Sequence, residues 1–314
     1  MKILILGASG HIGLTTAIYA KKKGYDVFAT FNTPNNKKLL ILKKFGIKVY
    51  NCNVLNKSKL KKIIHSHKIQ RCIYAAAVSH EIYAKKNPFN TIAANSIGIL
   101  NLLEIQKKKK FNLILISTGS VFQEIKNDKK IYETLVPTPK SIYSSTKRLG
   151  ELLLDVMTDN RNNISCILRI SWVYGPPLKL KKLNIQRGPI PKIVYDFVVN
   201  NQRKFILKKG SDFRASFTYI EDINEAIVNL LRKKKYKQTY YHLGTGKNNS
   251  LKEIFESLKK IDKKISYKIG KGAQPWSNDS IMRGPLANSD KKFIAKTSLE
   301  KGIKKYCDWL KKNA

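Results

Sequence analysis

The first thirteen residues constrain the fold more than any other stretch of this chain. They begin with Lys2-Ile-Leu-Ile-Leu6, whose apolar, branched side chains predict a strand buried on both faces, as in a parallel sheet. Gly7, Gly10 and Gly13 follow at intervals of three, and residues at helical spacing continue from Leu14 to Lys23. A strand that turns directly into a helix presents free backbone N–H groups, which hold a pyrophosphate. The stretch therefore predicts a unit that binds a dinucleotide.

Each glycine of this turn has its own expected purpose. Gly7 permits the tight turn, Gly10 lets the diphosphate approach the backbone, and Gly13 lets the helix pack on the strand. The common dinucleotide fingerprint has the spacing G-x-G-x-x-G, whereas this chain has G-x-x-G-x-x-G. The cofactor-binding residues expected in the turn are Gly7, Ser9, Gly10, His11, Ile12 and Gly13.

The end of the second expected strand, residues 25–31, bears on the choice of cofactor. A dinucleotide-binding fold that prefers NAD usually places an Asp or Glu there, where it binds the adenosine ribose. Here Asn32 follows the strand and Lys37 and Lys38 come soon after, with no carboxylate among them. Asn and Lys tolerate a 2′-phosphate that an acid would repel. We expect Asn32 to contact the cofactor, which is NAD or NADP with a lean toward NADP.

The net charge is unusual for a chain of 314 residues, which is long enough for one large domain or two intimate ones. Lys and Arg number 61 against 21 Asp and Glu, a formal net charge of +40. The basic residues are spread over every segment, and abundant Asn, Ile, Tyr and Lys share A/T-rich codons. Mutational bias therefore explains the charge as well as nucleic-acid binding does. A positive field still favours an anionic substrate.

Other classes of protein are disfavoured by what the sequence lacks. No apolar run approaches the roughly 18 residues of a spanning helix, and the start carries no secretory signal, so we expect a cytoplasmic protein without a membrane partner. The 4 cysteines lie far apart, which indicates neither a disulfide framework nor a zinc site. His65 and His67 would diverge on a helix, so we expect surface residues and no metal.

Three residues form a catalytic pattern. Residues 111–118 predict a buried strand that ends in the hydroxyl of Thr118, and Tyr143 and Lys147 follow at the start of a helix. Residues four apart meet on one helix face, so the ammonium lies near the phenol, favours the phenolate and lowers the tyrosine pKa. The Thr118 hydroxyl would bind a substrate oxygen and share its proton with Tyr143. Such a trio moves a proton on and off a carbinol while a nicotinamide moves a hydride.

In this order the motifs resemble the extended short-chain dehydrogenase/reductases, specifically the NAD-dependent epimerase/dehydratase family that modifies nucleotide-linked sugars. Later segments at 168–176, 217–223, 241–246 and 296–303 match the same family, so the resemblance covers essentially the whole chain. It implies an α/β fold, with a doubly wound parallel (Rossmann) sheet and a smaller C-terminal substrate lobe.

The domain boundaries follow from the alternation of expected strands and helices. The dinucleotide-binding domain is expected to comprise residues 1–172 plus 218–246, including a strand at 240–243. The substrate-binding lobe is expected to comprise residues 173–217 plus 247–314, with the substrate held between the two.

The resemblance also assigns residues to the site. Asn95, in a helix expected over 87–104, corresponds to the family's asparagine that helps to arrange a water beside the catalytic lysine. The residues that would lie along the adenine and ribose of the cofactor are Asn53, Val54, Ala75, Ala76 and Ala77. The substrate-binding residues implied are Ser79, Thr118, Arg214 and Arg283.

Departures from the family pattern bear on the reaction. Dehydratases carry an Asp-Glu pair after the catalytic Thr, but Gly119 and Ser120 stand here, so elimination of water lacks its acid and base. Ser171 and Trp172 resemble the corresponding residues of 4-ketoreductases. We predict a nucleotide-sugar epimerase that transiently oxidises a sugar carbinol. The alternative is an NADPH-dependent 4-ketoreductase, and a remote alternative is a non-catalytic polyanion-binding protein on the same fold. A homodimer is compatible with the sequence, which does not decide the oligomeric state.

Overall fold

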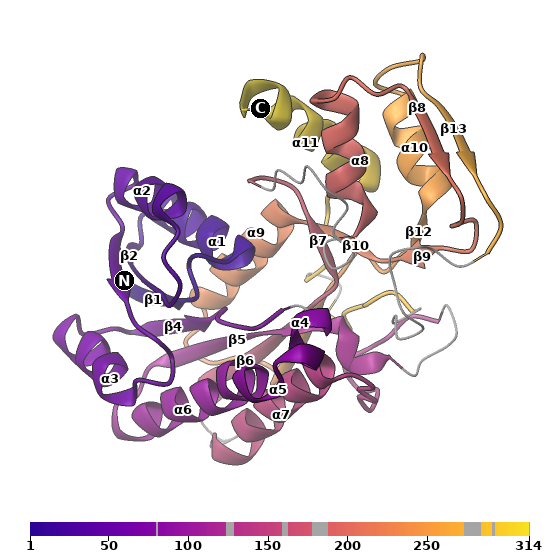
Figure 1. Cartoon of the computed structure of the whole chain (residues 1–314). Helices are drawn as coiled ribbons and strands as arrows, with labels where there is room; N and C mark the ends of the chain where they lie inside the picture. The colour runs from indigo at the N-terminus through magenta and orange to yellow at the C-terminus, as the bar shows by residue number, and fades with distance from the viewer. Residues whose placement is uncertain are drawn as a thin grey trace. The chain divides into compact units, whose positions relative to one another are not determined.

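The chain divides into two units, each made of three separate segments. The computed structural model (Figure 1) describes residues 1–79, 81–123, 129–158, 163–177, 188–272, 284–290 and 293–313. The first unit comprises Met1–Val121, Pro139–Arg169 and Ile223–Tyr241, and the second comprises Phe122–Thr138, Ile170–Asp222 and His242–Ala314.

A seven-stranded sheet in the order β11-β6-β5-β4-β1-β2-β3 forms the centre of the first unit. The pairs β1–β2, β2–β3, β1–β4 and β4–β5 are parallel, and the order runs outward from β1 in both directions. This is the expected doubly wound sheet, and its order reverses between β1 and β4, where such folds bind ligands. Its strands are β1 (Lys2–Leu6), β2 (Asp26–Phe31), β3 (Lys48–Asn51), β4 (Arg71–Tyr74), β5 (Asn112–Thr118), β6 (Ser165–Ile170) and β11 (Tyr240–Leu243).

Helices cover both faces of this sheet. Figure 1 shows α1, α2 and α9 on one face and α3, α6 and α7 on the other. The side chains of Thr15 and Thr16 donate to Asn224 Oδ1 at 3.2 and 3.0 Å, which joins α1 to α9. The helices are α1 (His11–Lys22), α2 (Asn36–Lys44), α3 (Lys57–Ser66), α4 (Glu81–Lys86), α5 (Pro88–Ile92), the π-helix η1 (Ala93–Ile97), α6 (Gly98–Lys108), the 3₁₀ turn η2 (Gly119–Phe122), α7 (Ile142–Met157) and α9 (Ile220–Leu231).

Strand β5 is an interior strand of the sheet, between β6 and β4, and belongs to the hydrophobic core of the first unit. All seven residues of β5 are buried, including Leu113 and Leu115, which pack with residues of β1, β4, α3 and α6. Each fully buried Leu or Ile contributes about 1.5–3 kcal/mol relative to an exposed one. Such a continuous apolar run is typical of a parallel strand buried on both faces, and Thr118 is its last residue.

The second unit is built from short two-stranded sheets and three helices. Strands β10 and β7 pair in parallel, as do β13 and β8, whereas β12 and β9 are antiparallel. Phe205, Phe255 and Tyr306 lie in its core, where α11 packs with α8 and α10. The elements are β7 (Trp172–Tyr174), α8 (Pro189–Val198), β8 (Lys204–Leu207), β9 (Arg214–Ala215), β10 (Phe217–Tyr219), β12 (Asn249–Ser250), α10 (Leu251–Lys259), β13 (Ser266–Ile269) and α11 (Leu299–Asn313).

Candidate active site

In the glycine turn between β1 and α1, neighbouring backbone segments pack closely against the glycines. Gly7 has φ +85°, and a Cβ there would lie 2.6 Å from the Cα of Ala76. A Cβ on Gly13 would lie 2.4 Å from the carbonyl oxygen of Gly7, so α1 packs directly on the turn. Gly10 is the N-cap residue of α1 and, having no side chain, leaves the first turn of the helix uncovered. The turn is therefore suited to an anion at the helix N-terminus.

Residues on either side of the turn are placed by the neighbouring strands. The backbone N–H groups of Gly7 and Ala8 donate to the carbonyl oxygen of Thr30 at the end of β2, at 3.1 and 2.8 Å. Lys38, on α2, donates from Nζ to the carbonyl oxygen of Ser9 at 2.6 Å. Asn32 is exposed directly after β2. The end of β2 and the start of α2 thus adjoin the glycine turn, where the ribose of a dinucleotide would lie.

The other residues expected to contact the cofactor lie after β3 and β4 or at the start of α1. Asn53 is exposed, and its Oδ1 accepts from the backbone N–H of Leu55 at 2.9 Å. Val54 is buried against the core, and a Cβ on Gly98 would meet its side chain. Of the remaining residues His11 is buried, Ser9, Ile12, Ala75 and Ala76 are half-buried, and Ala77 is exposed.

Asn95 lies in η1, a π-helix between α5 and α6 that the helical pattern did not predict. Its side chain is fully buried: Oδ1 accepts from Val78 N at 2.9 Å, and Nδ2 donates to Val78 O at 3.1 Å and to Thr146 Oγ1 at 3.0 Å. A π-turn inserts one residue into a helix and re-aims the side chains around it. Asn95 therefore joins the loop after β4 to α7, one residue before Lys147.

The expected catalytic trio lies at the end of β5 and the start of α7. Ser141 caps α7 through a reciprocal pair of hydrogen bonds with Ser144, which places half-buried Tyr143 in the first turn. The Lys147 Nζ donates to the carbonyl oxygen of Ile116 at 2.6 Å, two residues before Thr118. The Thr118 hydroxyl donates to Ser120 Oγ at 3.2 Å and accepts from Ser120 N at 3.1 Å.

Lys147 is a buried cation. Its side chain is only 3% exposed. Burial lowers its pKa to about 8, although the negative charge of Glu151 one turn later raises it. A lysine with this pKa is still mostly protonated at neutral pH, so it presents a positive charge on the helix face that also carries Tyr143. The arrangement favours the phenolate form of a neighbouring phenol.

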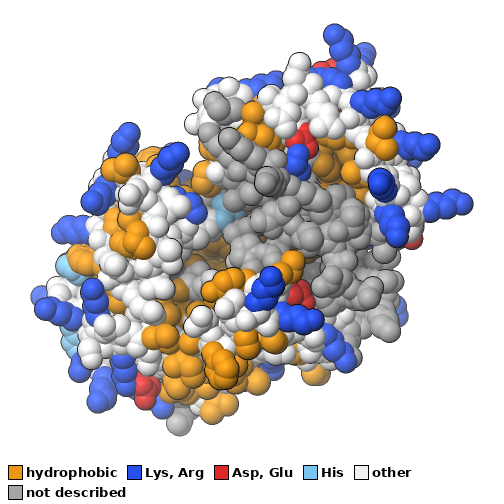
Figure 2. Space-filling model, viewed as in Figure 1, with side chains coloured by type: hydrophobic (Ala, Val, Ile, Leu, Met, Phe, Trp, Pro, Cys, Tyr) orange, Lys and Arg blue, Asp and Glu red, His pale blue; other side chains and the backbone are white. Residues whose placement is uncertain are grey.

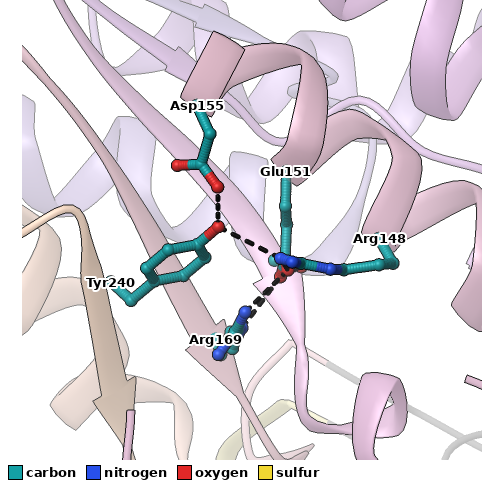
Figure 3. Close-up of polar contacts among 6 residues, drawn as sticks. Arg148, Glu151, Asp155, Arg169 and Tyr240 are labelled. Atoms are coloured by element: carbon teal, nitrogen blue, oxygen red, sulfur yellow. Dashed lines mark hydrogen bonds and ion pairs between the residues drawn. The ribbon is translucent and has the colours of Figure 1, made fainter. Parts of the chain in front are cut away.

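One turn further along α7, Glu151 belongs to a cluster of charged side chains that the sequence did not predict (Figure 3). The Glu151 carboxylate accepts from Arg169 Nε and Nη2 at 2.9 and 2.8 Å, from Arg148 Nη1 at 2.9 Å and from Ser117 Oγ at 2.6 Å. Arg148 also donates to the hydroxyl of Tyr240 at 3.0 Å, and that hydroxyl donates to Asp155. A carboxylate four residues after Lys147 and an arginine in a buried strand were the only signals in the sequence.

The residues expected to bind the substrate lie on separate elements. Ser79 is exposed in the loop after β4. Arg214 lies on β9 of the second unit, where its Nη1 donates to the carbonyl oxygens of Phe213 and Ser211 at 2.9 and 3.4 Å. Arg283 lies outside the described residues. Among the residues that the structure does describe, no three His, Cys, Asp or Glu side chains form a group able to hold a metal ion.

The two histidines considered for a surface role occupy the end of α3. His65 is exposed, whereas half-buried His67 stacks on Phe28 with ring centroids 4.4 Å apart and pairs through Nε2 with the hydroxyl of Tyr50 at 2.7 Å. His67 therefore has a packing role that the sequence did not predict. No helix in the described ranges is both long enough and apolar enough to cross a bilayer.

Comparison with known proteins agrees with this geometry. The NAD dependent epimerase/dehydratase family matches residues 3–244. The chain belongs to this family. Members of the family are enzymes. The residues around the glycine turn, β5 and α7 are therefore the candidate active site of this chain.

Individual relatives of the family extend along nearly the whole chain. UDP-glucuronate 4-epimerase of Thermodesulfobacterium geofontis is 29% identical, over 99% of this chain and 96% of its own. The structure of UDP-glucuronic acid 4-epimerase from Bacillus cereus, in complex with UDP-glucuronic acid and NAD, is 25% identical with a TM-score of 0.79, over 100% of both chains. UDP-glucose 4-epimerase of Thermotoga maritima shares the fold, with a TM-score of 0.83 at 22% identity over 99% of both chains.

Proposed function

We propose that this family member is a nucleotide-sugar epimerase that transiently oxidises a sugar carbinol and reduces it again on the other face. The observation that carries the proposal is the buried Lys147 cation, which is anchored on β5 just before Thr118 and shares a helix with Tyr143. The 4-epimerases among its relatives support the same reaction class. Gly119 and Ser120, where a dehydratase has an acid and a base, argue against elimination of water.

The proposed chemistry assigns a step to each residue of the trio. Tyr143, as phenolate, accepts the proton of the sugar hydroxyl and returns it when the keto sugar is reduced. Lys147 supplies the positive charge that keeps the phenolate accessible near neutral pH. Thr118 hydrogen-bonds the reacting oxygen and shares its proton with Tyr143. A nicotinamide bound by this unit supplies the hydride acceptor and donor. Asn95 holds α7 and the loop after β4 in place around the trio.

The residues of the glycine turn fit a dinucleotide, because added Cβ atoms at Gly7 and Gly13 would collide with backbone. We propose that the enzyme binds NAD or NADP, with a lean toward NADP. No carboxylate follows β2, Asn32 is exposed there, and Lys38 is held against the turn at Ser9. A 2′-phosphate would meet a cation and an amide at that place, whereas NAD would lack the carboxylate that usually binds its ribose.

The 4-ketoreductase alternative loses part of its support in the structure. The Ser171 hydroxyl donates to the carbonyl oxygen of Ser216 at 2.6 Å, which ties the chain before β7 to the chain before β10. The Trp172 ring packs edge-on against Phe213 and Phe217. Both side chains thus have a packing role inside the second unit, and their resemblance to a ketoreductase need not reflect the reaction.

Turnover assays separate the two reactions. The purified protein is analysed for co-purified dinucleotide and then incubated with UDP-glucuronate or UDP-glucose, with and without added NADPH. An epimerase interconverts the sugars with catalytic cofactor, because the cofactor is regenerated in each cycle. Stoichiometric consumption of NADPH with a keto sugar would identify the reductase. Failure to epimerise either sugar would contradict an epimerase of these substrates, and failure to oxidise NADPH with a keto sugar would contradict the reductase.

The substrate is proposed to be a nucleotide sugar. Ser79, Thr118 and Arg214 remain the proposed contacts, and Arg283 is proposed on sequence alone. A guanidinium suits a diphosphate because it donates two parallel hydrogen bonds. We further propose that the enzyme acts in the cytoplasm, where nucleotide sugars are made, and not on nucleic acid.

The oligomeric state is proposed from an apolar face of the first unit. Leu149, Leu152 and Val156 recur along α7 and are exposed, as is Ile97 on η1, and Val156 is 83% exposed. Figure 2 shows hydrophobic side chains gathered over α5, α6 and α7. In a chain with 61 Lys and Arg, exposed apolar side chains that recur along one helix suit a second copy presenting the same face. Sedimentation should show a homodimer, and Val156→Glu should give a monomer; a monomeric unaltered protein would refute the dimer.

A further inference from the structure

The charged cluster behind the catalytic helix joins the elements that carry the proposed trio. Glu151 belongs to α7, and its carboxylate binds Ser117 of β5 and Arg169 of β6. Ser117 directly precedes Thr118, and Glu151 lies one turn after Lys147. Lys147 itself binds β5 at Ile116. Two consecutive residues of β5, Ile116 and Ser117, are therefore held to α7 through two side chains one helical turn apart, and Thr118 follows them directly.

The charges of this cluster balance without Lys147, which adds one positive charge in excess. Glu151 and Asp155 are opposed by the guanidinium groups of Arg148 and Arg169, and Lys147 adds a further positive charge. The hydroxyl of Tyr240 lies between Asp155 and Arg148. Burial raises the pKa of Glu151, but the hydrogen bond and charge of Arg169, aided by Ser117 and Arg148, outweigh it, so this carboxyl is ionised at neutral pH.

Lys147 is the cation of the cluster that can lose its proton. Arginine keeps its proton in proteins, whereas a buried lysine readily becomes neutral. Burial already lowers the pKa of Lys147 to about 8, and Glu151 is the group whose charge opposes that effect. Removal of the Glu151 charge would leave Arg148 and Arg169 without their shared partner, and the excess positive charge would be relieved by deprotonation of Lys147.

We propose that Glu151 is a positioning residue, whose carboxylate keeps Lys147 a cation and fixes the end of β5 on α7 so that Thr118 stays in register with Tyr143. The inference rests on the proposed epimerase reaction, because that reaction gives the charge of Lys147 its task. Glu151 would therefore act in two ways. Its charge keeps Lys147 protonated, which we call the charge effect. Its bond to Ser117 holds β5 in position on α7, which we call the register effect.

The charge effect is tested with Glu151→Gln, which keeps the shape of the side chain. Lysine Cε resonances are followed against pH by ¹³C NMR, and the Lys147 signal is identified by its loss in Lys147→Arg. An opposite charge within about 4–6 Å shifts a pKa by 1–3 units, so we expect the Lys147 midpoint to fall by about one unit or more. The alkaline limb of kcat/KM should move to lower pH by the same amount. A midpoint and a limb that both stay in place would overturn the proposal.

Asp155→Asn is the matched control. It removes a carboxylate from the same cluster and the same helix, but one that binds Tyr240 and not Lys147 or Ser117. A general weakening of the cluster would move both variants alike, whereas the proposal requires that only Glu151→Gln displaces the Lys147 midpoint. If Glu151→Gln does not fold, E151Q with R169M removes the unpaired guanidinium as well, and the Lys147 midpoint should still fall.

The register effect is tested with two variants that keep the charge. Glu151→Asp retains the carboxylate on a shorter side chain, and Ser117→Ala removes its partner on β5. Both should leave the Lys147 midpoint near its original value while lowering kcat about tenfold with little change in KM. Unchanged kcat in both would remove the register effect. The NMR titration needs no substrate, so a protein without epimerase activity refutes the proposed function while the titration still decides whether Glu151 controls Lys147.

Discussion

At the scale of single residues, Tyr143 and Lys147 of the candidate site differ in how much they contribute to packing. Tyr143 is half-buried in the first turn of α7, where a phenylalanine would occupy nearly the same volume. We expect its hydroxyl to matter more for proton transfer than for the fold. Lys147 differs, because its burial and its bond to Ile116 make it part of the contact between α7 and β5 as well.

Tyr143→Phe should lower kcat by about 10²–10⁴, the usual contribution of a positioned acid–base group, and leave dinucleotide binding nearly unchanged. The measurement pairs steady-state turnover with the dissociation constant of the dinucleotide from fluorescence titration. Near-normal turnover would contradict the role given to the phenol, and loss of both properties would point to a structural one.

Gly13→Ala should destabilise the protein by about 1–3 kcal/mol, because its Cβ would lie 2.4 Å from the backbone of Gly7 and neither side can yield cheaply. Gly10→Ala is the comparison, since its Cβ meets the Gly7 carbonyl at 3.2 Å and φ is −76°. We expect Gly10→Ala to retain most stability but to weaken dinucleotide binding. Chemical denaturation and titration measure the two effects, and equal stability of both variants would argue against the packing role of Gly13.

At the scale of elements, α7 positions three of the groups discussed above, so its N-terminus should matter for activity. Ser141→Ala removes the cap of α7 and should cost about 0.5–2 kcal/mol. Ser250→Ala removes an equivalent capping box from α10 in the second unit. Both variants should unfold at lower denaturant, and only Ser141→Ala should also lower kcat. A fall in kcat of the same size in both would show that the loss comes from stability alone.

The sequence predicted those elements whose pattern is local. Residues 2–6 and 111–118 are runs of apolar side chains, and the structure forms β1 and β5 from them, one on each side of the central strand β4. The π-helix was not predicted, because the apolar residues of 87–104 recur at helical spacing. One residue inserted into the helix does not disturb that apolar pattern. The bond between Glu151 and Arg169 could not be predicted either, since it depends on which strand lies beneath α7.

At the scale of the whole molecule, the charge of +40 has no single site that explains it. Figure 2 shows Lys and Arg side chains distributed over the visible face and not gathered in one stripe. Surface charge of this kind attracts polyanions through a field that salt screens within about 10 Å at 0.1 M. It also raises the encounter rate with an anionic substrate.

RNA binding should therefore be weak and steeply salt-dependent, and should be lost by about 200 mM salt, while dinucleotide binding changes little. Fluorescence anisotropy with a labelled single strand at two salt concentrations measures the first, and cofactor titration in the same buffers measures the second. Tight RNA binding that survives the higher salt, without bound dinucleotide, would favour a polyanion-binding protein over an enzyme.

The interleaving of the two units along the chain limits how the protein can be divided. Residues 1–169 contain the glycine turn, Thr118, Tyr143 and Lys147, and a gene fragment of that length would seem to encode a complete hydride-transfer domain. It would lack residues 223–241, which bring Asn224 to Thr16 and Tyr240 to Arg148 and Arg169. In such a fragment, the edge of the sheet that β11 covers and the side of the charged cluster that Tyr240 covers would be open to water. The unit that carries the candidate site is consequently not encoded by one continuous stretch of the gene, and exchange of residues 1–169 alone would not transfer it whole.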